Sequence, residues 1–268
     1  MGLGNNDDQI LPQKIEDLSG IEIKTASSGA YVTAVITSQG DLLMCGNPIN
    51  GLMTDSERKR LKNSSDKIFK DSNEEMVVDN KNKEQHSFVE ILFFREHLVQ
   101  DISIGENVIC CKTEKKIFYW GKLGMNLIER PIEAKELDSQ NIIKISCGSS
   151  FIVCLSNSGD VFSWGNNDAR ELGHGAIGVH VPQPTKIIFS NNEKIKMIDI
   201  FSSYSSVVAL QEGSDFENNI VWGKKKNLFI FIFFKKKNSK ISMGIHCRTK
   251  ASSGCGIFKQ NVYFISNL

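Results

Sequence analysis

Three closely spaced glycines form the pattern that most clearly suggests a chemical function. Gly173, Gly175 and Gly178 fit the G-x-G-x-x-G pattern, which binds the pyrophosphate of a dinucleotide when it lies between a strand and a helix. Pro182 and Pro184 follow closely, and proline prevents the helix that this chemistry requires. We therefore predict that these glycines form turns and do not bind a nucleotide.

Other side chains that could react or bind lack the spacing that their chemistry needs. Ser149 and Ser150 could form a nucleophile pair, but they directly precede Phe151 at the start of an apolar run. The histidines, which show no metal-ligand spacing, are His86, His97, His174, His180 and His246. The chain contains no G-x-x-x-x-G-K-[ST] phosphate loop, no G-x-S-x-G nucleophile elbow and no H-E-x-x-H helix. We expect no catalytic, cofactor-binding or metal-binding residue, no cofactor, and a protein that is not an enzyme.

The three tryptophans lead from candidate chemistry to the elements that would hold them. Trp120, Trp164 and Trp222 could form an aromatic ligand cage, but each is followed by glycine and ends a short β-prone run. A fourth run of this kind ends in Cys45 and Gly46. Recurrence at one phase of a repeat favours packing between neighbouring repeat units. We predict that the three indoles are structural.

A second block precedes each of these runs. It contains Gly29, Gly105, Gly148 or, in the fourth copy, Ser203, and it lies 16 to 20 residues before the glycine that ends the run. In each copy, two stretches rich in Val, Ile, Phe and Tyr predict a β-hairpin. A further strand is expected after the prolines, over residues 186–189. Each unit should therefore form about four short strands, and repeated four-stranded sheets are the arrangement of a β-propeller.

The best copy of the unit resembles the repeat of the regulator of chromosome condensation family. It reads ISCGSSFIVCL over residues 145–155, GDVFSWGNN over 159–167 and ELGHG over 171–175. The resemblance covers residues 141–189 well, residues 1–46 and 88–140 with gaps, and residues 195–223 in degenerate form. It implies an all-β, RCC1-like β-propeller. Members of this family typically have seven blades, whereas this sequence has four clear copies.

The number of blades leaves two arrangements open. A degenerate fifth copy is suggested by residues 240–247 and 261–267, and a ring closed by the two termini within one blade would then have five blades. We favour an incomplete or open propeller, because five blades would be unusual for the family. The chain opens inside a unit, with residues 2–4 in the place of residues 172–173.

These patterns divide the chain into five parts. Residues 1–53 form an N-terminal RCC1-like repeat that starts inside a unit, 54–87 a charged loop insertion, 88–223 further RCC1-like repeats, 224–240 a Lys/Phe/Ile low-complexity segment, and 241–268 a basic tail with the degenerate repeat. The insertion has too few apolar residues to build a core, so we expect a solvated loop that could contact a partner. For the low-complexity segment, two hypotheses stay open: a strand flanked by lysines, or a translated intron.

Charge is divided unequally along the chain. Residues 1–223 carry 22 basic and 31 acidic side chains, whereas residues 224–268 carry ten basic and no acidic ones. A negative body repels phosphates, so nucleic-acid or chromatin contact could come only from the basic tail. The function that we predict is a protein–protein interaction module with a protein partner. The resemblance implies the alternative, guanine-nucleotide exchange on a Ran-like small GTPase, which needs loop contacts and no covalent chemistry.

Length, composition and cysteines set the remaining limits. A chain of 268 residues with 40% hydrophobic and 24% charged residues is typical of a globular protein, which excludes a collagen or a small disulfide scaffold. Seven cysteines without zinc or redox spacing favour reduced thiols in the cytoplasm or the nucleus. The N-terminus lacks a secretory signal pattern, and no apolar run reaches the roughly 20 residues of a transmembrane helix. We therefore expect an intracellular protein without a membrane span.

Overall fold

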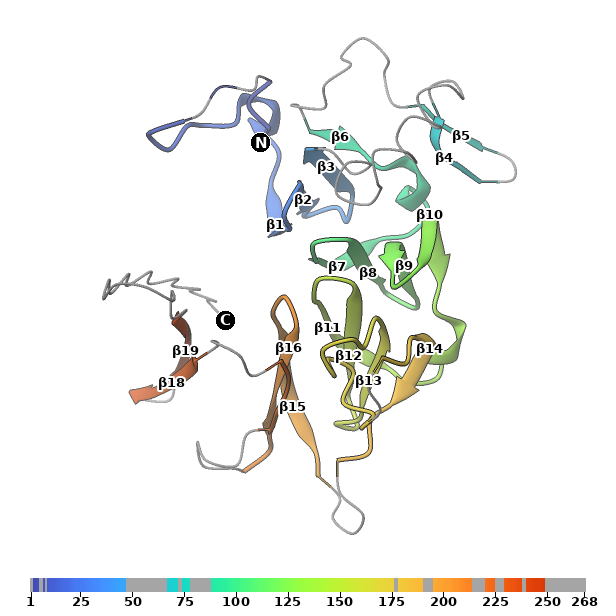
Figure 1. The fold of residues 1–268 in the computed structure, drawn as a ribbon. Helices are drawn as coiled ribbons and strands as arrows, with labels where there is room; N and C mark the ends of the chain where they lie inside the picture. The colour runs from blue at the N-terminus through green and yellow to red at the C-terminus, as the bar shows by residue number, and fades with distance from the viewer. Residues whose placement is uncertain are drawn as a thin grey trace.

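The computed structural model of the chain describes residues 2–4, 7, 9–46, 67–71, 74–77, 88–175, 178–189, 195–213, 220–224, 229–237 and 240–248. In these residues the fold is all-β, and successive antiparallel sheets follow one another along an arc (Figure 1). The predicted fold class, an all-β RCC1-like propeller arrangement without a closed ring, is confirmed. The helices of the described part are short 3-10 turns, and none is long and apolar enough to cross a membrane.

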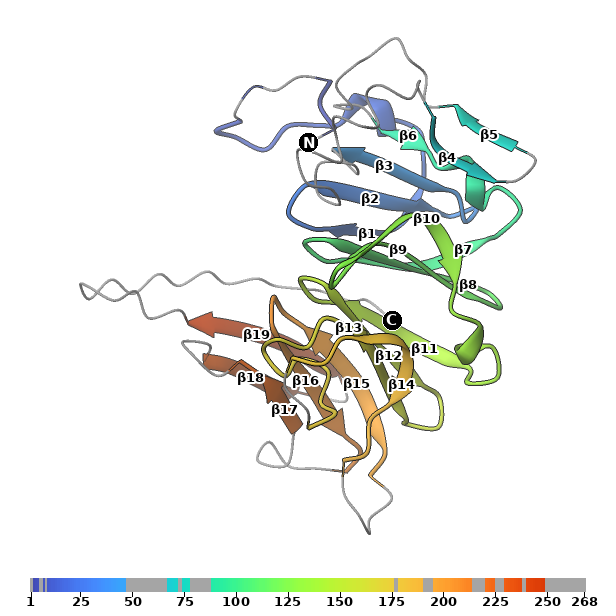
Figure 2. The ribbon, with the colours of Figure 1, turned by 45° about the vertical axis from the view of Figure 1, so that its right-hand side comes forward.

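We call each of the first four sheets a blade. Blade 1 contains β1 (Ile23–Ser28), β2 (Val32–Thr37), β3 (Leu42–Gly46) and β6 (Val89–Glu90), and blade 2 contains β7 (Val99–Ile104), β8 (Val108–Thr113), β9 (Ile117–Leu123) and β10 (Asn126–Glu133). Blade 3 contains β11 (Ile142–Cys147), β12 (Phe151–Ser156), β13 (Val161–Gly165) and β14 (Val181–Lys186), and blade 4 contains β15 (Met197–Ser202), β16 (Ser206–Gln211) and β17 (Ile220–Gly223). Strands pair in chain order within each blade. The first strand of each blade lies beside the first strand of the next, so that the blades stack as Figure 2 shows.

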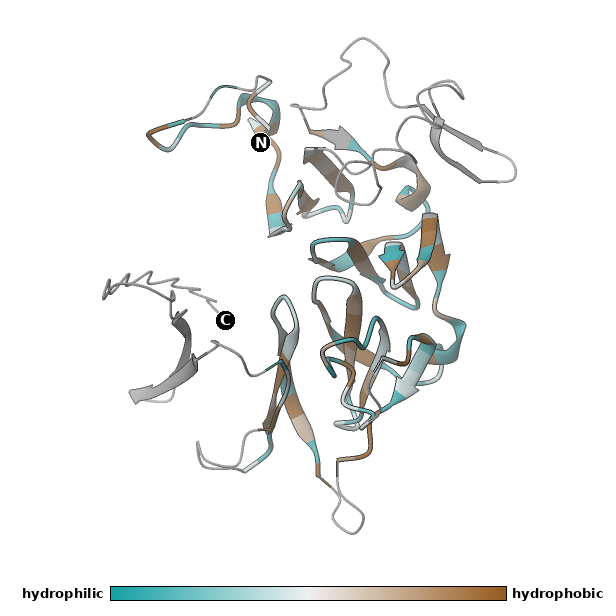
Figure 3. Ribbon diagram, viewed as in Figure 1, coloured by the Kyte–Doolittle hydropathy of each residue, from teal (hydrophilic) through white to brown (hydrophobic). Residues whose placement is uncertain are grey.

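The hydrophobic core lies between blades. One buried cluster joins blades 1 and 2, a second joins blades 2 and 3, and a third joins blades 3 and 4. Because successive side chains of a strand point to opposite faces, one strand contributes to two clusters. All of β12 is buried for this reason, and Figure 3 shows apolar residues along the central strands of the blades. Trp164 is fully buried and packs edge to face on Tyr119 of blade 2, with ring centres 5.4 Å apart.

The third strand of each blade contains a glycine with a positive φ, which ends the strand in blades 1, 3 and 4 and lies two residues before its end in blade 2. At Gly165, φ is 114°, and a Cβ atom would lie 2.6 Å from the Ser150 carbonyl oxygen and 2.7 Å from the Phe151 Cα. Residues with a side chain rarely adopt this conformation. The turn therefore requires glycine at position 165.

The first strands carry alternating charges, which we call the charge row: Lys24 on β1, Asp101 on β7, Lys144 on β11 and Asp199 on β15. Lys144 forms an ion pair with Asp199, and its ammonium lies 3.9 Å from the centre of the Phe201 ring. Burial raises the pKa of the Asp101 carboxyl, and the Ile102 N–H group and the positive charges of Lys112, Lys144 and Lys24 counteract this rise. Opposite charges therefore meet at each step from blade to blade.

One expectation about the strands needs correction. The strand expected over residues 186–189 is displaced, because β14 begins at Val181 and includes both prolines, which edge strands tolerate. Within the insertion, β4 (Lys67–Asp71) and β5 (Glu74–Val77) form a hairpin.

The C-terminal region was expected to contain a degenerate fifth copy of the repeat. β18 (Phe229–Lys237) pairs with β19 (Lys240–Arg248) in a separate hairpin. β19 continues through Gly244, where the suggested fifth copy would turn after its first strand. The second half of that copy, residues 261–267, lies outside the described residues.

Candidate interaction surface

The loops between the first and second strands of the four blades lie at the same end of the stack, because every blade has the same strand order. We call them the loop row, and they comprise residues 29–31, 105–107, 148–150 and 203–205. Their backbones approach closely. A Cβ atom on Gly105 would lie 1.9 Å from the Gly148 carbonyl oxygen, and one on Gly29 would lie 2.2 Å from the Gly105 carbonyl oxygen. Glycine at these positions therefore allows neighbouring blades to meet.

Hydrogen bonds between blades fix the loop row. The Asn107 N–H donates to the Ser149 carbonyl at 2.8 Å, and the Ser149 N–H donates to the Tyr204 carbonyl at 2.9 Å. The Ser149 hydroxyl donates to the Glu106 carboxylate at 2.6 Å, and the Asn107 amide donates to the Ser150 hydroxyl at 3.1 Å. Since each bond crosses from one blade to the next, the part of the row from blade 2 to blade 4 has a defined shape before any partner binds.

Two tyrosines project from the loop row. Tyr31, in the blade 1 loop, is 54% exposed, and Tyr204, in the blade 4 loop, is 68% exposed. Tyrosine is enriched in protein interfaces because its ring buries a large apolar area while its hydroxyl forms hydrogen bonds. No sequence motif marks these two residues as functional, and the available signal is that they lie within two residues of Gly29 and Ser203 of the repeated block.

The residues first considered for chemistry have structural roles. The hydroxyls of Ser149 and Ser150 bond to Glu106 and Asn107, not to a histidine. Trp222 donates its indole N–H to the Glu171 carbonyl of blade 3 at 2.8 Å, which is a packing contact between blades. Gly173 packs on Trp222, and Gly175 and Gly178 lie in the same irregular loop before β14. In the described ranges, no group of three or more His, Cys, Asp or Glu residues is placed to hold a metal ion.

A serine–histidine pair that the sequence did not indicate lies in blade 3. The Ser163 hydroxyl is 3.0 Å from His174 Nε2, but it also donates to the Leu172 carbonyl at 2.7 Å. A nucleophilic serine would have to donate its proton to the histidine. Ser163 is fully buried and its proton is directed to a backbone carbonyl, so the pair stabilises the loop that precedes β14.

Glu171 is a buried carboxylate in the same loop, at 4% exposure. It accepts hydrogen bonds from the Ala169 N–H at 2.6 Å and from the Asn166 amide at 3.4 Å. Burial is the main cause that raises the pKa of Glu171, and the nearby charge of Asp168 acts in the same direction. The charged form is therefore partly destabilised in the native state.

We expect Glu171→Gln to raise the melting temperature at pH 7 by roughly 2 °C, because the amide keeps an acceptor for Ala169 and removes a buried charge. In the native protein, Glu171 takes up a proton at a higher pH than in the unfolded chain. The contribution of Glu171 to wild-type stability should therefore rise as the pH falls from neutral toward the ordinary value of 4.5, below which both states are protonated. Thermal denaturation between pH 4.5 and 7 measures this. Glu136→Gln, at an exposed site, is the control, and parallel profiles for wild type and Glu171→Gln would contradict the assignment.

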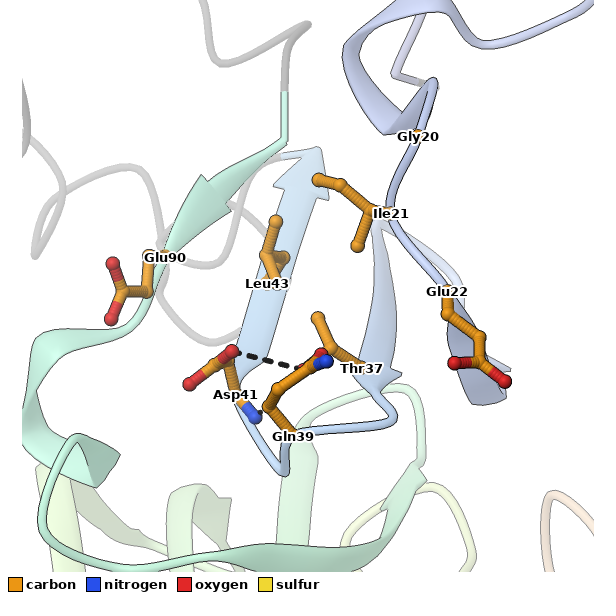
Figure 4. A pocket seen from close by; sticks show the side chains of 8 residues that line it. All are labelled: Gly20, Ile21, Glu22, Thr37, Gln39, Asp41, Leu43 and Glu90. Atoms are coloured by element: carbon orange, nitrogen blue, oxygen red, sulfur yellow. Dashed lines mark hydrogen bonds between the residues drawn. The ribbon is translucent and has the colours of Figure 1, made fainter.

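A cavity of about 680 Å³ lies on the face of blade 1 that points away from blade 2 (Figure 4). Its lining includes Ile21, Leu43 and the carboxylates of Asp41 and Glu90. Asp41 accepts a hydrogen bond from the Thr37 hydroxyl at 3.0 Å, and Glu90 is held by two bonds from Arg95 at 2.9 and 3.1 Å. These carboxylates are already engaged, so the cavity does not have the character of a cation site.

Comparison with known proteins agrees with this architecture. Two family models, both described as Regulator of chromosome condensation (RCC1) repeat, match residues 158–210 and residues 142–170. Human E3 ubiquitin-protein ligase HERC2 is 29% identical over 206 residues, which cover 73% of this chain and 4% of HERC2. The ultraviolet-B receptor UVR8 of Arabidopsis thaliana is 26% identical over 230 residues, which cover 85% of this chain and 47% of UVR8. The chain thus spans a small fraction of one relative and about half of the other.

Solved structures show the same fold at low sequence identity. Yeast RCC1 (Prp20), in its complex with Kap60, superposes with a TM-score of 0.55 at 15% identity over 78% of this chain and 43% of the other. Human WBSCR16 superposes with a TM-score of 0.53 at 19% identity over 74% of this chain and 46% of the other. The family matches, the repeated glycine and tryptophan positions and the stacked blades agree with one another. The chain is an RCC1-like repeat protein.

Proposed function

We propose that this protein is a non-enzymatic interaction module whose loop row binds a partner protein. The observation that carries the proposal is the pair of exposed tyrosines, Tyr31 and Tyr204, on a row whose loops in blades 2 to 4 are joined by hydrogen bonds. A preformed surface loses little conformational entropy on binding, and aromatic anchors contribute much of the affinity of protein interfaces. The similar yeast RCC1 was solved in complex with the protein Kap60, which supports a protein as partner. An intracellular location is part of the proposal, and it is supported by five free, buried cysteines.

The combined change Tyr31→Ala and Tyr204→Ala is expected to weaken partner binding at least tenfold, because each truncation removes a large exposed anchor. The variants are compared in affinity capture from cell extract with quantitative identification of the captured proteins. Ile188→Ala is the matched control, since Ile188 is 78% exposed and follows β14 at the opposite end of the blades. Proteins captured equally by the double variant and by wild type would contradict binding through the loop row.

The more specific candidate is guanine-nucleotide exchange on a Ran-like small GTPase. It is supported by the RCC1 repeat matches and by the structural similarity to yeast RCC1. An exchange factor weakens the hold on the nucleotide through binding energy alone, so it requires no catalytic triad. The test is the release of a fluorescent guanine nucleotide from a Ran-like GTPase with substoichiometric amounts of the folded chain. Faster nucleotide release that the two tyrosine changes reduce would support exchange activity. An unchanged rate of release would contradict exchange activity and leave only the interaction module.

The proposal assigns nucleic-acid or chromatin contact to residues 224–268 alone. Ten basic and no acidic residues lie there, whereas residues 1–223 contain nine more acidic than basic residues. Binding to DNA through such a segment would depend strongly on salt, because its affinity comes from released counterions.

A further inference from the structure

The outer edge of β17 in blade 4 has no partner strand among the described residues. In blade 3 the corresponding edge of β13 pairs with β14, with Phe162 opposite Lys186 and Ser163 opposite Thr185. β13 pairs with the second strand of blade 3, and β17 pairs with the second strand of blade 4. When the two pairs are aligned, Ile220 takes the position of Phe162 and Val221 takes the position of Ser163. Val221 is 51% exposed. An exposed apolar strand edge is a template for the addition of another strand.

Segment 9–15 has the sequence features of a fourth strand. In blades 2 and 3, a proline lies three residues before the apolar residue that ends the outer strand region, and the segment repeats this spacing. The pairs are Pro131 and Ala134, Pro184 and Ile187, and Pro12 and Ile15. In blades 1 and 2 the outer strand runs into a 3-10 turn, η2 (Leu92–Phe94) or η3 (Lys135–Leu137), and the segment likewise runs into η1 (Glu16–Leu18).

The segment lacks the burial that the outer strands have. In blades 1 to 3, the backbone N–H of the residue that follows the outer strand donates to the carbonyl of the first residue of the third strand. These bonds run from Ile91 to Leu42, from Ala134 to Ile117 and from Ile187 to Val161, each at 2.8 Å. These three donors are 6%, 1% and 3% exposed. Ile15, at the same position, is only half-buried. In the described part of the chain, no strand pairs with the segment.

The face of blade 1 beside this segment is also open. Its first-strand residue Ile23 is 37% exposed, whereas the residues at the same register in blades 2, 3 and 4, Val99, Ile142 and Met197, are 1%, 6% and 1% exposed. Those three are buried because each contacts the preceding blade. The cavity of Figure 4 lies on this face. Blade 1 therefore presents the surface that each other blade uses to contact its predecessor.

Two further features match blade 4 to this open face. Cys45 and Trp222 are equivalent residues, each directly before the glycine that ends the third strand. A Cβ atom on Gly2 would lie 3.3 Å from Cys45 Sγ, and one on Gly173 would lie 3.0 Å from the Trp222 indole nitrogen. The N-terminal residues therefore occupy the place that the loop of a preceding blade takes beside blade 4. The charge row ends in Lys24 on blade 1 and in Asp199 on blade 4. Blade 4 followed by blade 1 therefore continues the alternation of opposite charges.

We propose that segment 9–15 of one copy of this chain adds as the fourth strand to β17 of a second copy, and that blade 4 of the second copy packs on the open face of blade 1. This inference goes beyond the proposed function. Only residues 16–22 join the segment to β1, so the receiving strand must lie beside blade 1. Blades 1 and 4 of one chain are the two ends of the arc, with blades 2 and 3 between them (Figures 1 and 2). The receiving blade therefore belongs to another copy, in a head-to-tail contact.

The register gives a direct test by disulfide cross-linking. Transfer of the β13–β14 pairing to the new pair places Gln13 opposite Val221. Gln13→Cys and Val221→Cys are made on separate chains, after Cys247 and Cys255 are replaced by serine, since the five cysteines Cys45, Cys110, Cys111, Cys147 and Cys154 are buried. Under mild oxidation, the mixture should form a covalent dimer that neither variant forms alone. The shifted pair Lys14→Cys with Val221→Cys should cross-link at least tenfold less. Absence of a preference for the predicted register overturns the proposal.

The source of the added strand is tested with both cysteines on one chain. A second copy predicts cross-linked dimers or larger species whose yield rises with concentration. An intramolecular disulfide at a concentration-independent yield would show that the segment closes on its own blade 4, and would overturn the proposal.

Light scattering separates strand addition from simple apolar association. Ile15→Pro removes the N–H group that the outer strands donate and should weaken self-association at least tenfold. Ile10→Asp with Leu11→Asp should have a small effect, because the matching positions in β14, Pro182 and Gln183, are exposed. The opposite ranking, or a wild-type chain that stays monomeric at all concentrations, contradicts the proposal.

Discussion

Gly165→Val is expected to lower the free energy of unfolding by more than about 4 kcal/mol and to unfold blade 3, because two costs combine at this site. The residue has a φ of 114°, which a β-branched side chain rarely adopts. Its new Cβ would also meet the backbone of Ser150 and Phe151 at 2.6 and 2.7 Å. Backbone atoms in a sheet cannot move aside as a flexible side chain can, so blade 3 cannot keep its turn. Circular dichroism during thermal and urea denaturation measures the loss.

Gly213→Val is the matched control for backbone strain without steric overlap. Gly213 has a φ of 68°, and a Cβ atom added there would have no atom within 4 Å. It should therefore lose only the conformational term, about 1–2 kcal/mol. Equal losses at the two glycines would show that the close approach of Gly165 to the second strand does not contribute.

Trp164→Ala is expected to lower the free energy of unfolding by about 3–5 kcal/mol, the range for a large aromatic removed from a core. The indole is fully buried between blades 2 and 3 and packs on Tyr119. Its removal leaves a cavity at the contact between blades, where the rigid strands on both sides limit collapse. Denaturation followed by tryptophan-independent circular dichroism measures the effect.

Tyr204→Ala serves as the control for loss of an aromatic ring. Tyr204 is 68% exposed, so its truncation should change stability by less than about 0.5 kcal/mol. The result also shows whether this variant is folded when its partner binding is measured. A Trp164→Ala protein as stable as Tyr204→Ala would contradict the assignment of the indole to the core.

The repeat and its all-β units could be predicted because they depend on local signals. A glycine at positive φ after an aromatic residue, as at Trp164-Gly165, and apolar runs such as β12 recur at regular spacing. The outer strands gave weaker signals: β6 has only two residues, and β14 contains two prolines, which delayed its predicted start by five residues.

The candidate surface could not be predicted because its contacts join residues that are distant in sequence. The bonds from Asn107 to Ser149 and from Ser149 to Tyr204 depend on how one blade stacks on the next. No pattern within one repeat specifies that stacking. The hydrogen bond from the Trp222 indole to the Glu171 carbonyl likewise joins two different blades.

The charge row limits how such a chain can change its length. Lys24, Asp101, Lys144 and Asp199 alternate in sign from blade to blade. Loss of blade 3 alone would bring Asp101 next to Asp199, and loss of blade 2 alone would bring Lys24 next to Lys144, so that like charges would meet at a partly buried contact. Loss or duplication of two adjacent blades preserves the alternation. Gene rearrangements that change the number of repeats by two are therefore tolerated electrostatically, whereas changes by one require a compensating charge substitution.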